Sequence, residues 1–222
     1  MTQTIRSNDK DLQANVTDEL RFNPSIDAAL VGVSVDDGVV TLSGNVRSLP
    51  ERHAAKRAAM RVCGVKTISD NMVVRNPDPS GPKDTDIRDA ANQMLSWTVD
   101  VPSDAVKVSV HDHTITLSGT VAWQYQREAA ARAVMSIKGI TSVNNTISLT
   151  TTAPNTGLKA VIDAAIKRNA QLDSREITAE ITGGDVKLHG NVRSCAERRQ
   201  AENVAWSAAG VTSVHNNLNV TS

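Results

Sequence analysis

Histidine, serine and cysteine are the residue types here that could perform catalysis or hold a metal, and they form few combinations. Five histidines occur, and their one local cluster is His111-Asp112-His113. Two imidazoles and a carboxylate are ligands that Zn²⁺ or Ni²⁺ accepts, but no fourth ligand lies nearby in the sequence. A polar hairpin turn contains the same residues. We predict no metal and no other cofactor, and His111 and His113 are the metal candidates that the sequence offers.

Serine and cysteine form no catalytic pattern. Ser43-Gly44 and Ser118-Gly119 lack the flanking glycine of a nucleophile elbow, and no phosphate-binding or dinucleotide-binding fingerprint is present. Cys63 falls at the end of a predicted helix, where the dipole disfavours a thiolate. Cys195 falls in the first turn of another, where the pKa of an exposed thiol is lowered; a packed, unreactive thiol is the alternative. We predict that the protein is not an enzyme.

Composition sets wide limits on the class of protein. Of 222 residues, 40% are hydrophobic, 22% are charged and only 2% are aromatic, which is typical of a globular chain whose core is mostly aliphatic. Lys+Arg and Asp+Glu balance at 24 each, so nucleic acid is an unlikely partner. No apolar run approaches the roughly 18 residues of a transmembrane helix. The opening residues MTQTIRSNDKDLQ lack the apolar core of a signal peptide, which predicts a cytoplasmic protein as written, or a periplasmic one if a leader has been removed.

The elements around these residues come from one sequence that occurs three times. We name the copies module 1, module 2 and module 3, which align without a gap over 64 positions as residues 11–74, 86–149 and 157–220. Each contains a glycine-bearing strand, VVTLSGNV, TITLSGTV or DVKLHGNV, and a second glycine at a fixed distance after it. The remaining segments are predicted to be an N-terminal tail and two linkers, residues 1–10, 75–85 and 150–156.

Each module shows the same order of patterns. Apolar residues at i, i+4 and i+8 predict a first helix, with the stripes Leu12-Val16-Leu20, Ile87-Ala91-Leu95 and Leu158-Ile162-Ile166. Two alternating segments and a polar turn then predict a β-hairpin, small apolar residues a second helix, and a last alternation a third strand. The order α-β-β-α-β predicts an α+β fold of three modules, each a small three-stranded sheet with two helices packed on one face. Six glycines are predicted to be structural: Gly44, Gly119 and Gly190 end a strand, and Gly64, Gly139 and Gly210 end the second helix.

These strand patterns resemble the BON domain, a family named after bacterial osmotically inducible and nodulation proteins. The resemblance covers nearly the whole chain and rests on the LSG-V strand and on a closing strand of the form G-[VI]-x-x-[VI]-x-N-x-[ILM]. Module 1 departs at Asp70, where the other modules have Asn145 and Asn216. The resemblance implies a non-catalytic adaptor for phospholipid surfaces or cell-envelope proteins, tied in several members to osmotic or envelope stress.

Module 2 breaks the repeat with its aromatic residues. Trp97 stands in the slot of Phe22 and Arg168, and Trp123-Gln-Tyr-Gln126 replaces the helix-capping boxes that begin at Ser48 and Ser194. Tryptophan and tyrosine are the usual residues of membrane interfaces and protein hot spots. The candidate lipid- or partner-binding residues are Trp97, Val99, Val101, Trp123 and Tyr125, with the basic residues Arg52, Lys56, Arg57, Arg198 and Arg199. The alternatives are that the rings cover a seam between modules and that the basic residues form a solvated helix face.

The preferred hypothesis is a multivalent, stress-related adaptor that associates with a phospholipid surface or an envelope protein. A cytoplasmic scaffold that binds proteins or forms homo-oligomers is the second hypothesis. A small-ligand or metal sensor is the third.

Overall fold

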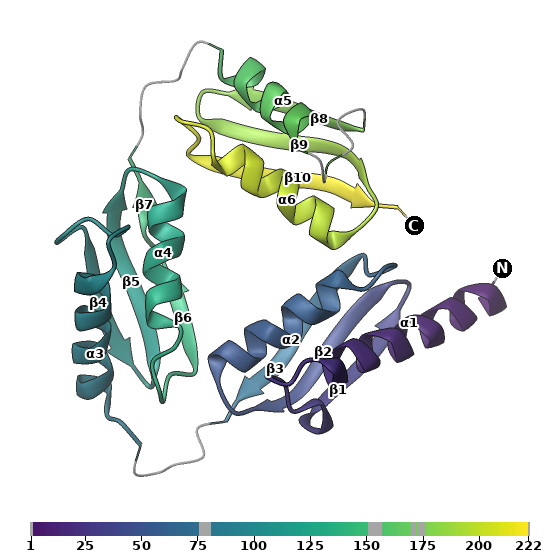
Figure 1. Ribbon diagram of the computed structural model, residues 1–222, viewed down its shortest axis with the longest axis horizontal. Helices are drawn as coiled ribbons and strands as arrows, with labels where there is room; N and C mark the ends of the chain where they lie inside the picture. Colours follow the sequence, from purple (N-terminus) through teal and green to yellow (C-terminus); the bar gives the residue numbers. More distant parts are fainter. Residues whose placement is uncertain (1, 76–80, 151–156, 170–171, 173–175, 222) are drawn as a thin grey trace. The chain divides into compact units, whose positions relative to one another are not determined.

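A computed structural model describes residues 2–75, 81–150, 157–169, 172 and 176–221, with side chains described from residue 8 onward. It contains three separate sheets, one in each module (Figure 1). The predicted α-β-β-α-β order is confirmed in all three. The second predicted linker lies almost wholly outside the described residues.

Module 1 consists of α1 (Thr2–Phe22), β1 (Val31–Asp36), β2 (Val39–Val46), α2 (Leu49–Arg61) and β3 (Thr67–Val74). Module 2 consists of α3 (Asp84–Trp97), β4 (Val106–His111), β5 (Thr114–Val121), α4 (Gln124–Val134), β6 (Ser142–Asn145) and β7 (Ser148–Leu149). Module 3 consists of α5 (Leu158–Arg168), β8 (Ile177–Thr182), β9 (Asp185–Val192), α6 (Cys195–Trp206) and β10 (Ser213–Val220). The closing strand of module 2 is thus divided into two short strands.

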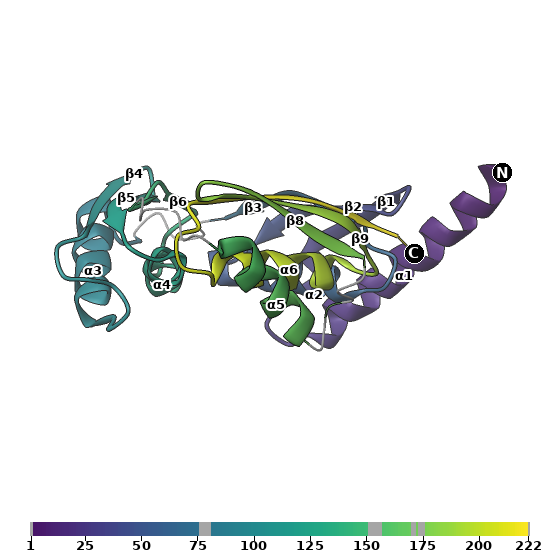
Figure 2. The ribbon, with the colours of Figure 1, turned by 90° about the horizontal axis from the view of Figure 1, so that it is seen from above.

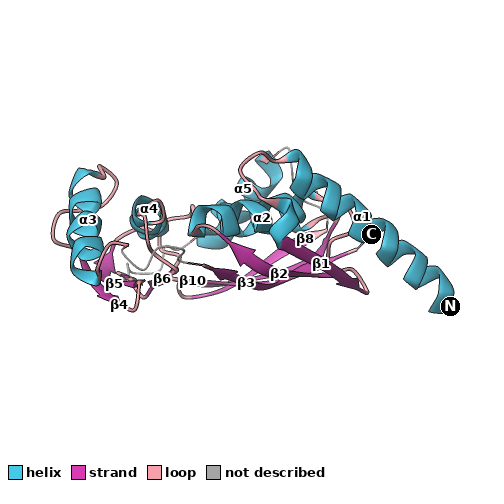
Figure 3. Ribbon diagram, turned by 90° about the horizontal axis from the view of Figure 1, so that it is seen from below, coloured by secondary structure: helices cyan, strands magenta, loops and turns pink. Residues whose placement is uncertain are grey.

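The second hairpin strand is central in every sheet. In modules 2 and 3 it pairs antiparallel with the first strand, as β4 with β5 and β8 with β9, and parallel with the closing strand. Both helices of a module cover the same face of its sheet, as Figures 2 and 3 show. Because only one face is covered, strand residues alternate between the core and solvent, which explains the alternation in the sequence.

The core follows the predicted stripes. All nine residues of the three first-helix stripes are buried, and so are the inward residues of the central strands. In the second helices, alanines such as Ala58, Ala130 and Ala201 are fully buried, because a methyl side chain lets the helix pack closely on the sheet. Trp206, in the slot that Met60 and Met135 occupy in the other modules, packs against the core of module 3.

The glycines of the central strands do not end them. Each of these strands continues past its glycine for two residues, to Val46, Val121 or Val192. Gly190 has a φ of +128°, and a Cβ there would overlap the carbonyl oxygen of Glu176. That oxygen accepts a hydrogen bond from the backbone N–H of Asn191 at 3.2 Å. The glycine is needed for this close approach of two backbones rather than to stop the strand. Gly64, Gly139 and Gly210 have φ near +90°, but the second helices end three to five residues before them, at Arg61, Val134 and Trp206. These glycines therefore supply the left-handed turn that follows each helix rather than its end.

The predicted tail and first linker are partly structured. α1 begins at Thr2 and α3 at Asp84, inside the segments assigned to tail and linker. The carboxylate of Asp9 accepts hydrogen bonds from the backbone N–H groups of Asp37 and Gly38, at 3.0 and 3.1 Å. Asp84 does the same for Asp112 and His113, at 2.9 and 3.0 Å. The first helix therefore holds the hairpin turn through one carboxylate, a contact that lies outside the predicted module boundaries.

The asparagine of the closing strand ties that strand to the second helix. The Asn216 side-chain amide donates to the carbonyl of Arg198 at 3.0 Å, while its oxygen accepts from the N–H of Leu218 at 3.3 Å. Asn145 makes the equivalent pair of bonds in module 2. A carboxylate cannot donate to a carbonyl, so Asp70 cannot reproduce this bridge in module 1.

Candidate functional site

The candidate site is the end of module 2 where α3 ends and α4 begins. The register of the hairpin pairs Val106, at the start of β4, with Gly119, near the end of β5. The loop between α3 and β4 and the segment between β5 and α4 therefore lie at the same end of the module (Figure 1). This topology brings residues 97–99 and 123–125, which are distant in sequence, to one end of the fold. We call this end, defined by Trp97, Val99, Trp123 and Tyr125, the aromatic end.

Large apolar side chains are exposed at the aromatic end. Val99 is 98% exposed, Trp97 73%, Tyr125 52% and Trp123 41%. Sequence reasoning missed Met94, which is 40% exposed and lies one helical turn before Trp97 on α3. The sequence could have indicated this residue, since Met94 and Trp97 are three residues apart and share a helix face. Exposure of such side chains on one end is typical of a surface that binds another molecule.

Val101 differs from the other candidates because it is buried. The N–H of Val101 donates to the carbonyl of Thr98 at 3.0 Å, and the Thr98 hydroxyl donates to the carbonyl of Met94 at 2.7 Å. Ile26 and Leu172 occupy the same slot in the other modules and are also buried. Val101 is thus the residue that fixes the loop to the core, and this fixed loop holds Val99 in solvent.

Trp123 stands at the position of a capping serine. Tryptophan has no oxygen with which to accept a helix N–H. Only half of the capping box remains, because the Gln126 side-chain oxygen accepts from the N–H groups of Ala122 and Trp123, both at 3.1 Å. Module 3 keeps the whole arrangement: Ser194 Oγ accepts from Glu197 N–H at 3.1 Å, and Glu197 accepts from Arg193 N–H at 2.7 Å. Module 2 thus forgoes a serine cap worth about 1 kcal/mol, and a half-exposed indole stands in its place.

Positive charge lies mainly on the other two modules. Arg57 of α2 and Arg199 of α6 are exposed, whereas Arg52, Lys56 and Arg198 are half-buried. Module 2 has an arginine, Arg127, at the position of Arg52 and Arg198. The backbone carbonyls of Arg127 and Arg198 accept hydrogen bonds from the side-chain amides of the closing-strand asparagines. The loop of the aromatic end itself carries the exposed acids Asp100 and Asp104.

The residues suited to catalysis are scattered in the structure. His111 is 90% exposed and contacts Asp112 at 3.1 Å, whereas His113 is half-buried in a turn with a φ of +61°. Within the residues that the structure describes from position 8 onward, no three His, Cys, Asp or Glu side chains are placed to share a metal ion. Burial raises the pKa of the Cys195 thiol, and the charge of Arg198 offsets this only in part. Cys195 is therefore the packed thiol rather than the activated one, while Cys63 is exposed.

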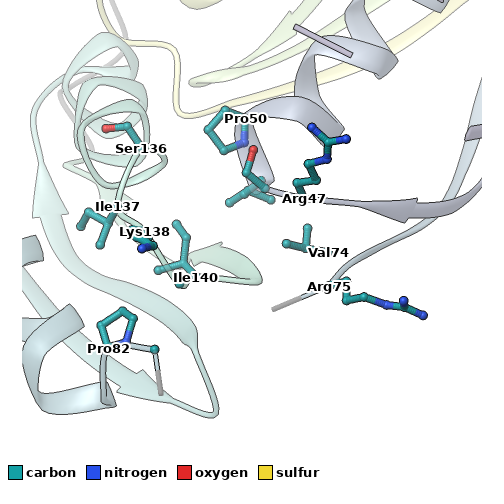
Figure 4. A pocket seen from close by; sticks show the side chains of 13 residues that line it. Arg47, Pro50, Val74, Arg75, Pro82, Ser136, Ile137, Lys138 and Ile140 are labelled. Atoms are coloured by element: carbon teal, nitrogen blue, oxygen red, sulfur yellow. The ribbon is translucent and has the colours of Figure 1, made fainter. Parts of the chain in front are cut away.

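A separate pocket of about 340 Å³ has a mainly apolar lining (Figure 4). Apolar side chains and three basic ones line it: Leu49, Pro50, Val74, Pro82, Ile137 and Ile140 with Arg47, Arg75 and Lys138. No histidine, cysteine or carboxylate is among the lining residues. Such a lining suits an anionic apolar molecule and does not supply acid–base catalysis.

Across the described helices, none combines the length and the apolar character that crossing a bilayer requires.

Comparison with known proteins identifies the family. The family model "BON domain" matches residues 8–76, 83–151 and 154–222. The chain belongs to the BON-domain family. Its three family matches include Asp9 and Asp84, the carboxylates that hold the hairpin turns.

One curated relative is osmotically-inducible protein Y of Escherichia coli (strain K12). It is 33% identical over 141 residues, which are 62% of this chain and 70% of that protein. Among solved structures, CdsD, a structural protein of the type III secretion system of Chlamydia trachomatis, aligns over 95% of this chain and 92% of its own at 14% identity, with a TM-score of 0.27. The PrgH periplasmic domain covers 92% of this chain and 99% of its own at 12% identity, with a TM-score of 0.22. TM-scores this low carry no argument about arrangement or function.

Proposed function

We propose that this three-module BON protein is a non-catalytic adaptor that associates with phospholipid surfaces through the aromatic end of module 2, in a stress-related role. The observation that carries the proposal is the exposure of Trp97, Val99, Trp123 and Tyr125 at one end of module 2. Indole and phenol groups suit the boundary between headgroups and acyl chains, because one part of each ring is apolar and the other hydrogen-bonds.

The magnitude favours a weak contact at the aromatic end. Insertion of the aromatic end removes on the order of 300 Å² of apolar surface from water, or about 7.5 kcal/mol at 25 cal/mol per Å². Loss of translational and rotational freedom costs about 4 kcal/mol or more. The surplus corresponds to a modest affinity, which further contacts on the same chain can raise through effective concentration. Arg57 and Arg199 are exposed cations on the same chain and suit anionic headgroups.

The stress-related part of the proposal is supported by family membership and by a relative whose name states osmotic induction. We expect the level of the protein to rise after a hyperosmotic shift, which immunoblotting measures. An unchanged level over several generations would remove this part and leave the lipid contact untouched.

Vesicle sedimentation tests the lipid contact. We expect anionic vesicles to sediment the native chain, and a Trp97→Ala, Trp123→Ala variant to lose at least tenfold in apparent affinity. Val161→Ala is the matched control, because Val161 is a half-exposed apolar residue on α5 of module 3. Equal binding of the aromatic variant and the control contradicts the proposal.

A protein scaffold is the competing function, because exposed aromatic residues also form protein interfaces. It predicts vesicle indifference together with a defined oligomer in light scattering, and loss of that oligomer in the Trp97→Ala, Trp123→Ala variant.

A small-ligand function is favoured only by the pocket in Figure 4. It predicts saturable heat on calorimetric titration with laurate, weakened by Lys138→Glu. Absence of heat at millimolar laurate removes it.

A further inference from the structure

Module 1 exposes an aromatic residue at the place where module 2 exposes Trp97. Phe22 is the last residue of α1 and is 83% exposed. Leu30, immediately before β1, is 46% exposed. The register pairs Val31 with Gly44, so the start of β1 lies beside the end of β2, and this is the end of the module at which α1 finishes. Phe22 and Leu30 therefore occupy the end of module 1 that corresponds to the aromatic end of module 2.

The turn after Phe22 is fixed. The Asn23 side-chain oxygen accepts from the N–H of Ser25 at 3.1 Å and from its hydroxyl at 2.8 Å. The N–H of Ile26 donates to the carbonyl of Asn23 at 3.1 Å, and Ile26 is buried in the slot of Val101. The aromatic ring thus stands in water beside a hydrogen-bonded turn, which reduces the entropy of loop ordering that is lost on contact.

The charge around Phe22 and the small apolar area of Phe22 and Leu30 indicate which kind of partner binds this end of module 1. Arg21 is exposed and lies 3.6 Å from Asp18, and Arg47 is exposed at the same end of the module. A phenyl ring and a leucine offer far less than the roughly 1,000 Å² that a specific protein interface buries. A lipid surface has no such minimum, since single apolar side chains insert into it independently.

Module 3 lacks this feature. Its residue at the Phe22 position is the exposed Arg168, which follows the exposed Lys167 at the end of α5. At this position the three modules therefore carry a phenyl ring, an indole and a guanidinium, and only the first two of these groups are apolar.

We propose that module 1 makes a second insertion into the same lipid surface through Phe22 and Leu30, so that modules 1 and 2 dock together while module 3 does not insert. This inference rests on the proposed function. Residues 75–83 join the two modules, and nine residues span at most about 30 Å, so one docked module keeps the other close to the surface.

Sedimentation with vesicles of 30% phosphatidylglycerol in phosphatidylcholine tests the inference. We expect Phe22→Ala to lower the apparent affinity about tenfold or more, and Arg168→Phe to raise it, because a third apolar end is added. Val161→Ala is the control, and circular dichroism of each variant verifies the fold. A Phe22→Ala chain that binds within twofold of the native chain overturns the inference, and if Trp97→Ala still weakens binding, the proposed function survives. Vesicle indifference of the native chain overturns both.

Fluorescence from position 22 tests directly whether this residue enters the lipid. Phe22→Trp in a chain whose three native tryptophans are changed to phenylalanine makes position 22 the sole tryptophan, which is excited selectively at wavelengths that tyrosine does not absorb. We expect a blue shift with vesicles and quenching by acyl-chain-brominated lipid. Unshifted, unquenched emission from this variant under conditions in which it sediments with vesicles contradicts the insertion.

Discussion

Substitution of Gly190 by alanine is predicted to remove most of the stability of module 3 while modules 1 and 2 keep theirs. A φ of +128° is strained for an L residue by about 1–3 kcal/mol. The new Cβ also overlaps the carbonyl of Glu176, which must move away and weaken the 3.2 Å bond from Asn191, at about 1 kcal/mol more. A module of about 64 residues has a free energy of unfolding of roughly 3–5 kcal/mol, so a loss of about 2–4 kcal/mol removes most of it.

Gly183→Ala is the matched control for this variant. Gly183 also has a positive φ, +63°, but a Cβ there meets nothing within 4 Å. Its cost is the backbone strain alone, about 1 kcal/mol. Trp206, packed on the core of module 3, reports the unfolding of that module in a chain with Trp97→Phe and Trp123→Phe.

Urea denaturation followed by Trp206 emission distinguishes the two cases. We expect the midpoint of Gly190→Ala to fall far below that of Gly183→Ala, with far-ultraviolet circular dichroism retaining the signal of the other modules. Equal midpoints for the two alanine variants would refute the claim that a backbone contact, rather than strand termination, requires this glycine.

Three further outcomes are expected. Asp84→Ala leaves two backbone N–H groups of the module 2 turn without their carboxylate and should lower its free energy of unfolding by about 1–2 kcal/mol in thermal denaturation, whereas Asp89→Ala, an exposed change on the same helix, should be neutral. Asn216→Asp should destabilise module 3 by about 1–3 kcal/mol in urea, because the carbonyl of Arg198 loses its donor and a carboxylate faces it. Since burial raises the pKa of the Cys195 thiol, alkylation by iodoacetamide at pH 8 should modify Cys63 first, and Cys195 should react only as the pH approaches its raised pKa or module 3 unfolds; equal rates at pH 8 would contradict its burial.

The sequence predicts the scaffold well because the periodicities that encode it are local. Leu12, Val16 and Leu20 repeat at helical spacing, and their counterparts in the other modules are buried in the same way. Three copies in one chain also allow each element to be checked against two others, which is why the predicted order of elements is correct.

The errors concern contacts between residues distant in sequence. Gly190 resembles a strand end, because nothing near it in the sequence shows that the carbonyl of Glu176 approaches. Asp9 resembles part of a polar tail, although its partners lie 28 and 29 residues away at the hairpin turn. Val101 is grouped with its exposed neighbour Val99, yet comparison with Ile26 and Leu172 would have identified it as a core position.

The aromatic end could be anticipated only in part. Module 3 has an arginine, Arg168, at the position of Trp97, which indicates that a side chain at this position need not be buried. Trp97 is indeed exposed. The meeting of residues 97–99 with residues 123–125 depends on the hairpin register and therefore on tertiary structure. Met94 escapes notice because methionine at that spacing is equally common in helix cores.

The most direct measurement of the central claim is the emission of Trp97 and Trp123 in a Trp206→Phe chain titrated with vesicles that contain acyl-chain-brominated lipid. If the aromatic end enters the lipid interface, the emission shifts to shorter wavelength and is quenched in proportion to the bound fraction. Emission that remains at its aqueous maximum and unquenched, at lipid concentrations where the protein sediments with vesicles, would show that this end stays in water and that another surface makes the contact.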